Sequence, residues 1–148
     1  AGLTREAQLK ILELTAGKVA TIFDSSMGFR HGPKSFINEK TIMFGFVNNT
    51  PYTRDFDLEI LEEVHGDEIA AGVFAIAQPG KRNFSGSTIE YSAETALLPD
   101  GYLALADIMV AQTVALLTSI KVGNKPDTPS PTGTVNRVVK GVTIYDYK

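Results

Sequence analysis

The sequence has 148 residues, of which 43% are hydrophobic, a length and composition that allow one domain with its own buried core. It contains no cysteine, which excludes a disulfide framework, a thiolate metal site and a cysteine nucleophile. The net charge is −3 and lysine and arginine do not cluster, so no nucleic-acid partner is expected, while a small anionic ligand needs only a few local donors.

A helix is predicted at the start of the chain, where Thr4 is an N-cap, good helix formers follow and Gly17 is a natural stop. The first residues show no basic-then-apolar signal pattern, which together with the lack of cysteine favours a cytoplasmic protein. The β-branched residues 19–23 predict a strand and residues 24–28 a turn, and Pro33 predicts the start of a short helix.

Two nearly continuous apolar runs, at residues 41–47 and 72–77, predict strands that are covered on both faces. Between them, apolar residues at helical spacing with acidic residues opposite predict a helix over about residues 52–64. Residues 88–91 have the composition of a short edge strand.

The most apolar part of the chain predicts a long helix over about residues 103–121. Its length raises the question of a membrane span, but four polar side chains in its interior are costly to place in lipid: Asp107, Gln112, Thr113 and Thr118. We therefore predict a buried helix and no membrane partner. The remaining residues, 125–148, are rich in proline, threonine and glycine and predict an irregular tail.

Helices that alternate with strands predict an α/β fold, a three-layer sandwich with a mainly parallel sheet flanked by helices. The order opens with a helix, whereas doubly wound domains normally open with a central strand whose carboxyl end carries the ligand loop. We expect that first strand to lie upstream of Ala1. Residues 1–124 are predicted to form most of the domain, and residues 125–148 a separate tail.

Lys10 and Glu13 are three residues apart on the first predicted helix and therefore share a face. A cation beside a carboxylate favours the ionised form, which can accept a proton. An ordinary solvated ion pair explains the same spacing, and on spacing alone it is the commoner case.

Residues 29–35 place His31 between Arg30 and a Gly-Pro turn, just before a predicted helix. Neighbouring positive charge and a helix N-terminus both disfavour the imidazolium, and a neutral imidazole can exchange protons near neutral pH. A histidine that only hydrogen-bonds its own loop is the alternative. The only other histidine, His65, lies at an exposed helix end and is assigned no role, and two isolated histidines do not make a metal site.

Several common catalytic signatures are absent from the sequence. It has no G-x-x-x-x-G-K-[ST] or G-x-G-x-x-G loop, so those two kinds of nucleotide fold are not supported. It also has no G-x-S-x-G nucleophile turn.

Three motifs occur together along the whole length of the chain: Leu-Glu-Leu at residues 12–14, Phe-Arg-His-Gly-Pro-Lys at 29–34 and Asn-Arg-Val-Val-Lys-Gly-Val-Thr-Ile-Tyr at 136–145. In this combination the chain resembles the second sugar isomerase (SIS) domain of the galactosamine-6-phosphate deaminase/isomerase family, whose members are often labelled tagatose-6-phosphate ketose/aldose isomerases. It resembles more distantly the isomerase domain of glucosamine-6-phosphate synthase, which has a K-x-x-E helix, an L-K-H-G-P turn and an A-K-S-V-T-V tail. The resemblance implies a flavodoxin-like SIS fold.

The resemblance places the catalytic carboxylate at Glu13, its partner at Lys10, the turn histidine at His31, with Arg30 in support, and the tail lysine at Lys140. Between Glu13 and His31 the chain is slightly longer than the synthase pattern, in the loop at residues 24–28. Glu13 would move a proton from C2 to C1 of an open-chain sugar, and Lys140, on a tail that closes over the site, would stabilise negative charge or meet the carbonyl. His31 would act in ring opening at a neighbouring subunit's site, which implies a homodimer or larger assembly.

The implied reaction is the conversion of galactosamine 6-phosphate to tagatose 6-phosphate and ammonia, without a metal or cofactor. The phosphate-binding loop of the family lies mainly in a first SIS domain, and no S-x-S-x-[ST] loop follows a strand here. The N-terminal SIS domain of the same protein is therefore an expected partner, beside the phosphorylated hexose or amino sugar, and this chain alone is expected to be inactive. Two alternatives remain: a non-catalytic sugar-phosphate sensor of a regulator, and a half-domain that only completes a dimer.

Overall fold

The computed structural model describes residues 2–92, 98–133 and 141–147. The elements in chain order are α1 (Gly2–Leu14), α2 (Ser26–Arg30), the 3-10 helix η1 (Pro33–Phe36), β1 (Ile42–Phe46), α3 (Pro51–Gly66), β2 (Gly72–Ala77), β3 (Ser87–Glu90) and α4 (Asp100–Lys121).

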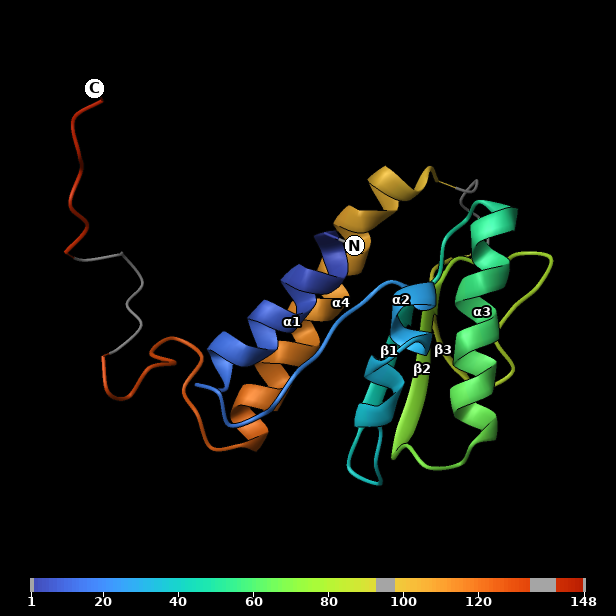
Figure 1. Ribbon diagram of the computed structural model, residues 1–148, viewed down its shortest axis with the longest axis horizontal. Helices are drawn as coiled ribbons and strands as arrows, with labels where there is room; N and C mark the ends of the chain where they lie inside the picture. The colour runs from blue at the N-terminus through green and yellow to red at the C-terminus, as the bar shows by residue number, and fades with distance from the viewer. Residues whose placement is uncertain (1, 93–97, 134–140, 148) are drawn as a thin grey trace.

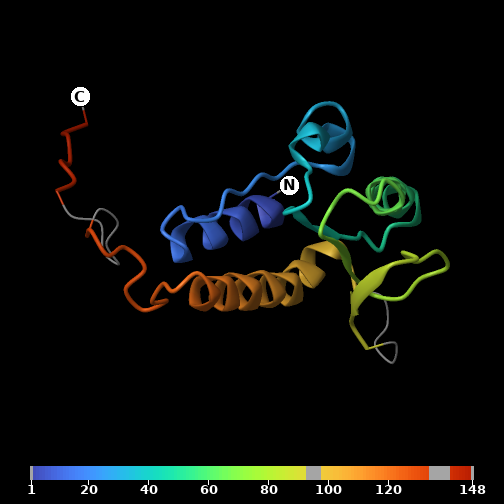
Figure 2. The ribbon, with the colours of Figure 1, turned by 90° about the horizontal axis from the view of Figure 1, so that it is seen from below.

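The three strands form one parallel sheet in the order β1, β2, β3. Figures 1 and 2 show α3 on one side of this sheet and the paired helices α1 and α4 on the other. This arrangement confirms the predicted α/β fold with a parallel sheet flanked by helices. It also confirms β3 as a short edge strand.

The hydrophobic core lies between α3 and the face of the sheet that it covers. The buried side chains there come from α3, from alternate positions of β2, from the residue after β1 and from the loop before β3: Val47, Leu58, Ile60, Leu61, Val64, Val73, Ala75, Ala77 and Phe84. Gly45 of β1 allows α3 to approach closely, because a Cβ atom at this position would lie 2.7 Å from Cδ2 of Leu61. The amphipathic pattern that predicted this helix therefore describes its packing correctly.

A second layer is formed by α1 and α4, which lie side by side (Figure 2). Two polar contacts join the C-terminal ends of the two helices. Ser119 Oγ and Asn124 Nδ2 donate hydrogen bonds of 2.6 Å and 2.7 Å to the carbonyl oxygen of Leu14. One side of α4 is buried through Leu103, Asp107, Ala111, Ala115 and Ser119. The prediction of a buried helix is correct for this side and wrong for the other, which is exposed.

By length and apolar composition alone, α4 could cross a membrane, and 28% of its most apolar window is buried inside the protein.

The strand predicted at residues 19–23 is wrong: the segment has no assigned strand structure. Its contacts run to α1, where Gln8 Nε2 donates to the carbonyl oxygen of Thr21 at 2.9 Å and Thr21 Oγ1 donates to that of Gln8 at 3.4 Å. A segment with strand propensity forms a strand only where the backbone of a neighbouring strand pairs with it. Among the described residues, no strand pairs with this segment.

Two further predictions about chain turns differ from the structure. Thr4 lies inside α1, which begins at Gly2, so its assignment as an N-cap is wrong. The segment predicted as a turn at residues 24–28 contains the start of α2, whose N-cap is Ser25, with a hydrogen bond of 3.1 Å from Gly28 N to Ser25 Oγ. A tertiary contact stabilises this short helix, because Ser26 Oγ donates to a carboxylate oxygen of Asp57 on α3.

Candidate functional site

The ion pair predicted on α1 is present. Lys10 Nζ lies 3.0 Å from Glu13 Oε2 and 3.4 Å from Glu6 Oε1, so one ammonium group forms ion pairs with two carboxylates. The hydrogen bond to Glu13 raises the pKa of Lys10, against the opposing effect of its partial burial. Glu13 is half-buried on the last turn of α1, so a ligand can reach its carboxylate, whose orientation is held by Lys10.

His31 is the C-cap residue of α2, and its backbone N–H donates to the carbonyl oxygen of Gly28 at 3.1 Å. The residue is exposed, at the corner between α2 and η1. The helix predicted after it is η1, a single 3-10 turn that begins at Pro33 as expected. An exposed imidazole at a corner can reach a molecule outside this chain.

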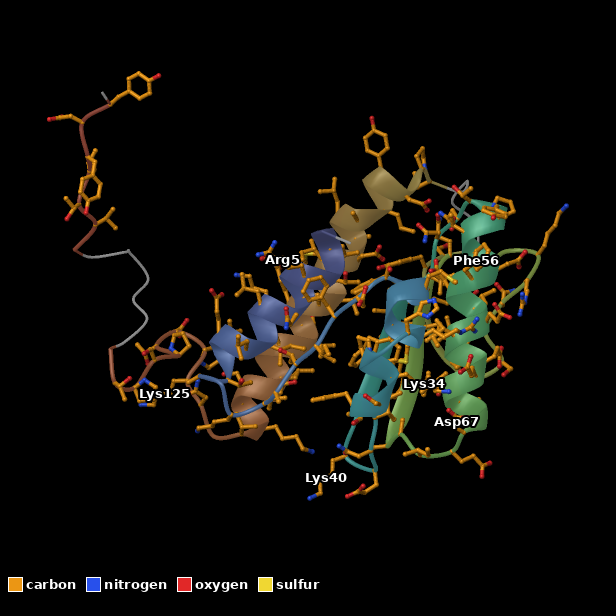
Figure 3. The ribbon with its side chains drawn as sticks, in the orientation of Figure 1. Arg5, Lys34, Lys40, Phe56, Asp67 and Lys125 are labelled. Carbon is orange, nitrogen blue, oxygen red and sulfur yellow. The ribbon has the colours of Figure 1, made fainter. Side chains whose placement is uncertain are left out.

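Charged side chains hold this corner against α3. Arg30 lies 2.9 Å from Glu63 and 3.4 Å from Glu59. Lys34 lies 2.5 Å from Glu63 and 2.7 Å from Asp67, and Figure 3 shows Lys34 and Asp67 side by side at the end of α3. The hydrogen bonds to Asp67 and Glu63 raise the pKa of Lys34, and the bond from Lys34 lowers the pKa of Glu63.

We call these five residues, Arg30, Lys34, Glu59, Glu63 and Asp67, the corner clamp. The clamp fixes the backbone on both sides of His31. Arg30 is engaged by α3 in this chain, and its support of a substrate stays a prediction.

The predicted site residues fall into separate groups. The structure brings Lys10 and Glu13 together on α1, and it places Arg30 and His31 together at the corner beside α3. In Figures 1 and 2, the end of α1 that carries Glu13 points away from α2, and no contact joins Glu13 to His31 in the part of the chain that the structure describes. The third predicted catalytic residue, Lys140, lies outside the described residues.

The tail was predicted to close over the active site. Residues 141–147 extend away from the helices and the sheet in both views, and they have no regular secondary structure. Closure of the tail therefore stays a prediction.

A cavity of about 410 Å³ lies at the carboxyl end of β1, the place where open α/β sheets bind ligands. The start of α1, the loop before α2, the end of β1 and the first turns of α4 line it, through Leu3, Thr4, Asp24, Ser25, Ser26, Phe46, Val47, Asn48, Asp57, Asp100, Gly101, Leu103, Ala104 and Asp107. It is therefore lined by four carboxylates and several hydroxyl and amide groups.

Asp57 organises one wall of this cavity. Its carboxylate accepts hydrogen bonds from Ser26 Oγ, from Asn48 N at 3.0 Å and from Asn48 Nδ2 at 2.5 Å. These bonds tie the start of α2 and the end of β1 to α3. Sequence reasoning missed Asp57, because in a single amphipathic helix it is one acidic residue among several, and its partners are distant in the sequence.

Asp107 lines the cavity from α4. It accepts a hydrogen bond of 2.8 Å from Tyr91 Oη, and burial raises its pKa. The sequence signalled this residue only as a carboxylate inside an apolar helix. Within the described residues no group of three or more His, Cys, Asp or Glu side chains could hold a metal ion.

Comparison with known proteins gives close relatives along nearly the whole chain. The sequence is 46% identical over 153 aligned positions to D-galactosamine-6-phosphate deaminase AgaS of Escherichia coli O157:H7, and the match covers 99% of this chain and 38% of that protein. It is 37% identical to the protein of the same name from Shewanella sp. (strain ANA-3), over 98% of this chain and 35% of the relative. No protein-family model matches the sequence.

The structure is similar to the crystal structure of tagatose-6-phosphate ketose/aldose isomerase from Escherichia coli, with a TM-score of 0.84 and 40% sequence identity. That similarity covers 99% of this chain and 37% of the solved chain. The resemblance inferred from the three motifs is thus confirmed by sequence and by fold. The chain spans little more than a third of the length of the relatives it matches.

Proposed function

We propose that this chain is the C-terminal part of an aldose/ketose isomerase-deaminase that acts on a six-carbon sugar phosphate. The favoured reaction takes galactosamine 6-phosphate and water to tagatose 6-phosphate and ammonia. The observation that carries the proposal is the Lys10–Glu13 ion pair on α1, in a chain 46% identical to a protein named as this deaminase. The reaction makes the whole protein a hydrolase as well as an isomerase, and we place it in the cytoplasm.

Glu13 is the proposed base. In the open-chain amino sugar its carboxylate takes the proton from C2, which gives an enolamine, and returns that proton to C1, which gives an imine at C2. Water then adds at C2 and the nitrogen leaves as ammonia, so that the ketose remains. Lys10, at 3.0 Å, orients the carboxylate and is a positioning residue.

His31 is the proposed acid and base for opening the sugar ring. Its exposure at the corner between α2 and η1 supports a role at the site of a second subunit, so the active enzyme would be at least a homodimer. The corner clamp holds the backbone around His31 in place for such a contact. Lys140 is the proposed group that meets the carbonyl or the developing negative charge.

The test of Glu13 is exchange of deuterium from solvent into C2 of galactosamine 6-phosphate by the full-length protein. Glu13→Gln should reduce the exchange rate at least about 100-fold, because removal of a general base typically has an effect of this size. Glu6→Gln is the matched control, since Glu6 also pairs with Lys10 on the same helix. Undiminished exchange in Glu13→Gln would exclude this residue as the base.

The test of His31 separates ring opening from proton transfer. His31→Ala should lose turnover of the cyclic substrate and keep exchange with an open-chain analogue, while His65→Ala serves as the control. If His31→Ala loses both activities equally, the assigned role is wrong. If the full-length wild-type protein binds the sugar phosphate but catalyses no exchange with either the cyclic or the open-chain substrate, the protein is a sensor.

A further inference from the structure

The outward side of α4 is an exposed apolar surface. Six large side chains on it are open to solvent, with exposed fractions of 69%, 71%, 62%, 43%, 59% and 58% for Tyr102, Leu105, Met109, Leu116, Leu117 and Ile120. We call these residues the α4 strip. In Figure 2 no helix or strand of the described residues lies beside the outer side of α4, opposite α1.

The α4 strip has the spacing of a helix packing surface. Tyr102, Leu105 and Met109 follow one another at intervals of three and four residues, and Leu116 and Ile120 continue the same side two turns later. The buried side of α4, which faces α1, is made of different residues: Leu103, Asp107, Ala111, Ala115 and Ser119. The helix therefore has two packing faces, and only one of them is covered here.

The chemistry of the strip indicates a protein partner. No charged side chain lies between Tyr102 and Ile120 on the exposed side, since Asp107 is buried on the other side. Gln112 and Thr113 are exposed within the strip and can form hydrogen bonds. A contiguous exposed apolar surface of this length marks a contact with another protein or with a membrane, and the polar side chains within it favour a protein.

The position of the start of the chain favours one occupant. Leu3 and Thr4 line the same cavity as Gly101 and Ala104, so any polypeptide that precedes α1 enters beside the first turns of α4. The match covers only 38% of the relative, so such a protein has ample sequence outside these residues to cover the strip. A segment tethered this close has a high effective concentration at the strip.

We propose that the α4 strip packs against an apolar surface of the polypeptide that precedes α1 in the same full-length protein. The contact is intramolecular, and it explains why α4 is apolar on both sides. It does not depend on the reaction proposed for the protein, because none of the six residues belongs to the proposed catalytic set.

The test uses variants of the native full-length protein that each carry one introduced cysteine. Each variant is labelled with N-ethylmaleimide, and the rate of labelling at that position is measured by peptide mass spectrometry. Met109→Cys and Leu105→Cys should react at least about tenfold more slowly than in the unfolded protein, because a packed site reacts only when it opens. Ile69→Cys is the matched control, since Ile69 is 52% exposed in the loop after α3, and it should react rapidly. Equal reactivity of the strip and the control would overturn the proposal.

The identity of the partner is read from a photo-crosslink. The full-length protein is made with p-benzoylphenylalanine at position 109 and irradiated. A crosslink within one polypeptide, to a peptide outside these 148 residues, is the expected result. A product of twice the monomer mass would identify a second copy as the occupant. Protection of Met109→Cys only in the presence of lipid vesicles would identify a membrane, and either of these results overturns the proposal.

Discussion

Tyr91 and Asp107 form a polar contact between the end of the sheet and the middle of α4. Tyr91 Oη donates a hydrogen bond of 2.8 Å to Asp107 Oδ1, and only 6% of Asp107 is exposed. Burial raises the pKa of both groups. A second polar contact, a hydrogen bond of 2.7 Å from Asn49 N to Asp100 Oδ1, joins the first turn of α4 to the end of β1.

Tyr91→Phe should lower the free energy of unfolding of the full-length protein. The substitution removes the donor and leaves a buried carboxylate oxygen without it, a change that costs about 1–3 kcal/mol. Urea unfolding of both proteins measures the effect. Tyr52→Phe, at an exposed position, is the control and should change the stability little. Equal stability of Tyr91→Phe and the wild type would show that the bond contributes nothing to the fold.

Asp107→Asn should change how stability depends on pH. Because burial raises the folded pKa of Asp107 above its unfolded value, the folded state holds this proton more tightly, and its contribution is most favourable at low pH. That contribution is lost as pH rises from the unfolded pKa, about 3.9, through the higher folded pKa. Asparagine does not titrate, so the variant should gain stability relative to the wild type between acidic and neutral pH. Unfolding midpoints across this range measure it, and parallel curves would contradict the assignment.

The features that could be predicted from the sequence are those set by local pattern. The strands 42–46 and 72–77 were predicted because parallel strands covered on both faces read as continuous apolar runs. Their expected burial is found in β2, whereas β1 is only partly buried and Ile42 is exposed. The Lys10–Glu13 pair was predictable because residues three apart on a helix share a face. Both depend on neighbours in the sequence.

The features that could not be predicted depend on distant contacts. Residues 19–23 have strand composition, yet a strand also needs a pairing neighbour, which composition does not reveal. Arg30 has its partners, Glu59 and Glu63, on α3, about thirty positions along the chain, and no spacing rule connects them. The uniform apolar character of α4 hid the difference between its covered and uncovered sides, because helical periodicity is weak when nearly every position is apolar.

The corner clamp should weaken in acid. The hydrogen bond from Lys34 lowers the folded pKa of Glu63, so its stabilising contribution is present above the unfolded pKa, about 4.3, and is lost as pH falls through the lower folded value. The Glu63 side chain is 37% exposed, so solvent screens the pair and the effect should stay below about 1 kcal/mol.

Glu63→Gln tests the clamp. The variant should be less stable than the wild type at neutral pH, and the difference should shrink below about pH 4 as the wild-type carboxylate is protonated. Raising the salt to about 1 M should shrink it as well. Glu39→Gln, at an exposed carboxylate before β1, is the control. A difference that persists at low pH would mean that the side chain acts through packing and not through charge.

Gly45→Ala should destabilise the packing of α3 on the sheet. The new Cβ atom would lie 2.7 Å from Cδ2 of Leu61, a side chain that is fully buried and has no room to move away. Overpacking of this kind typically costs about 1–3 kcal/mol, measured by urea unfolding. Gly101→Ala is the matched control, because nothing lies within 4 Å of the added atom in α4, and it should be neutral or stabilising by up to about 1 kcal/mol. Combining Gly45→Ala with Leu61→Ala should cost less than the sum of the two single changes, since the contact is removed, whereas strict additivity would show that the two residues do not meet.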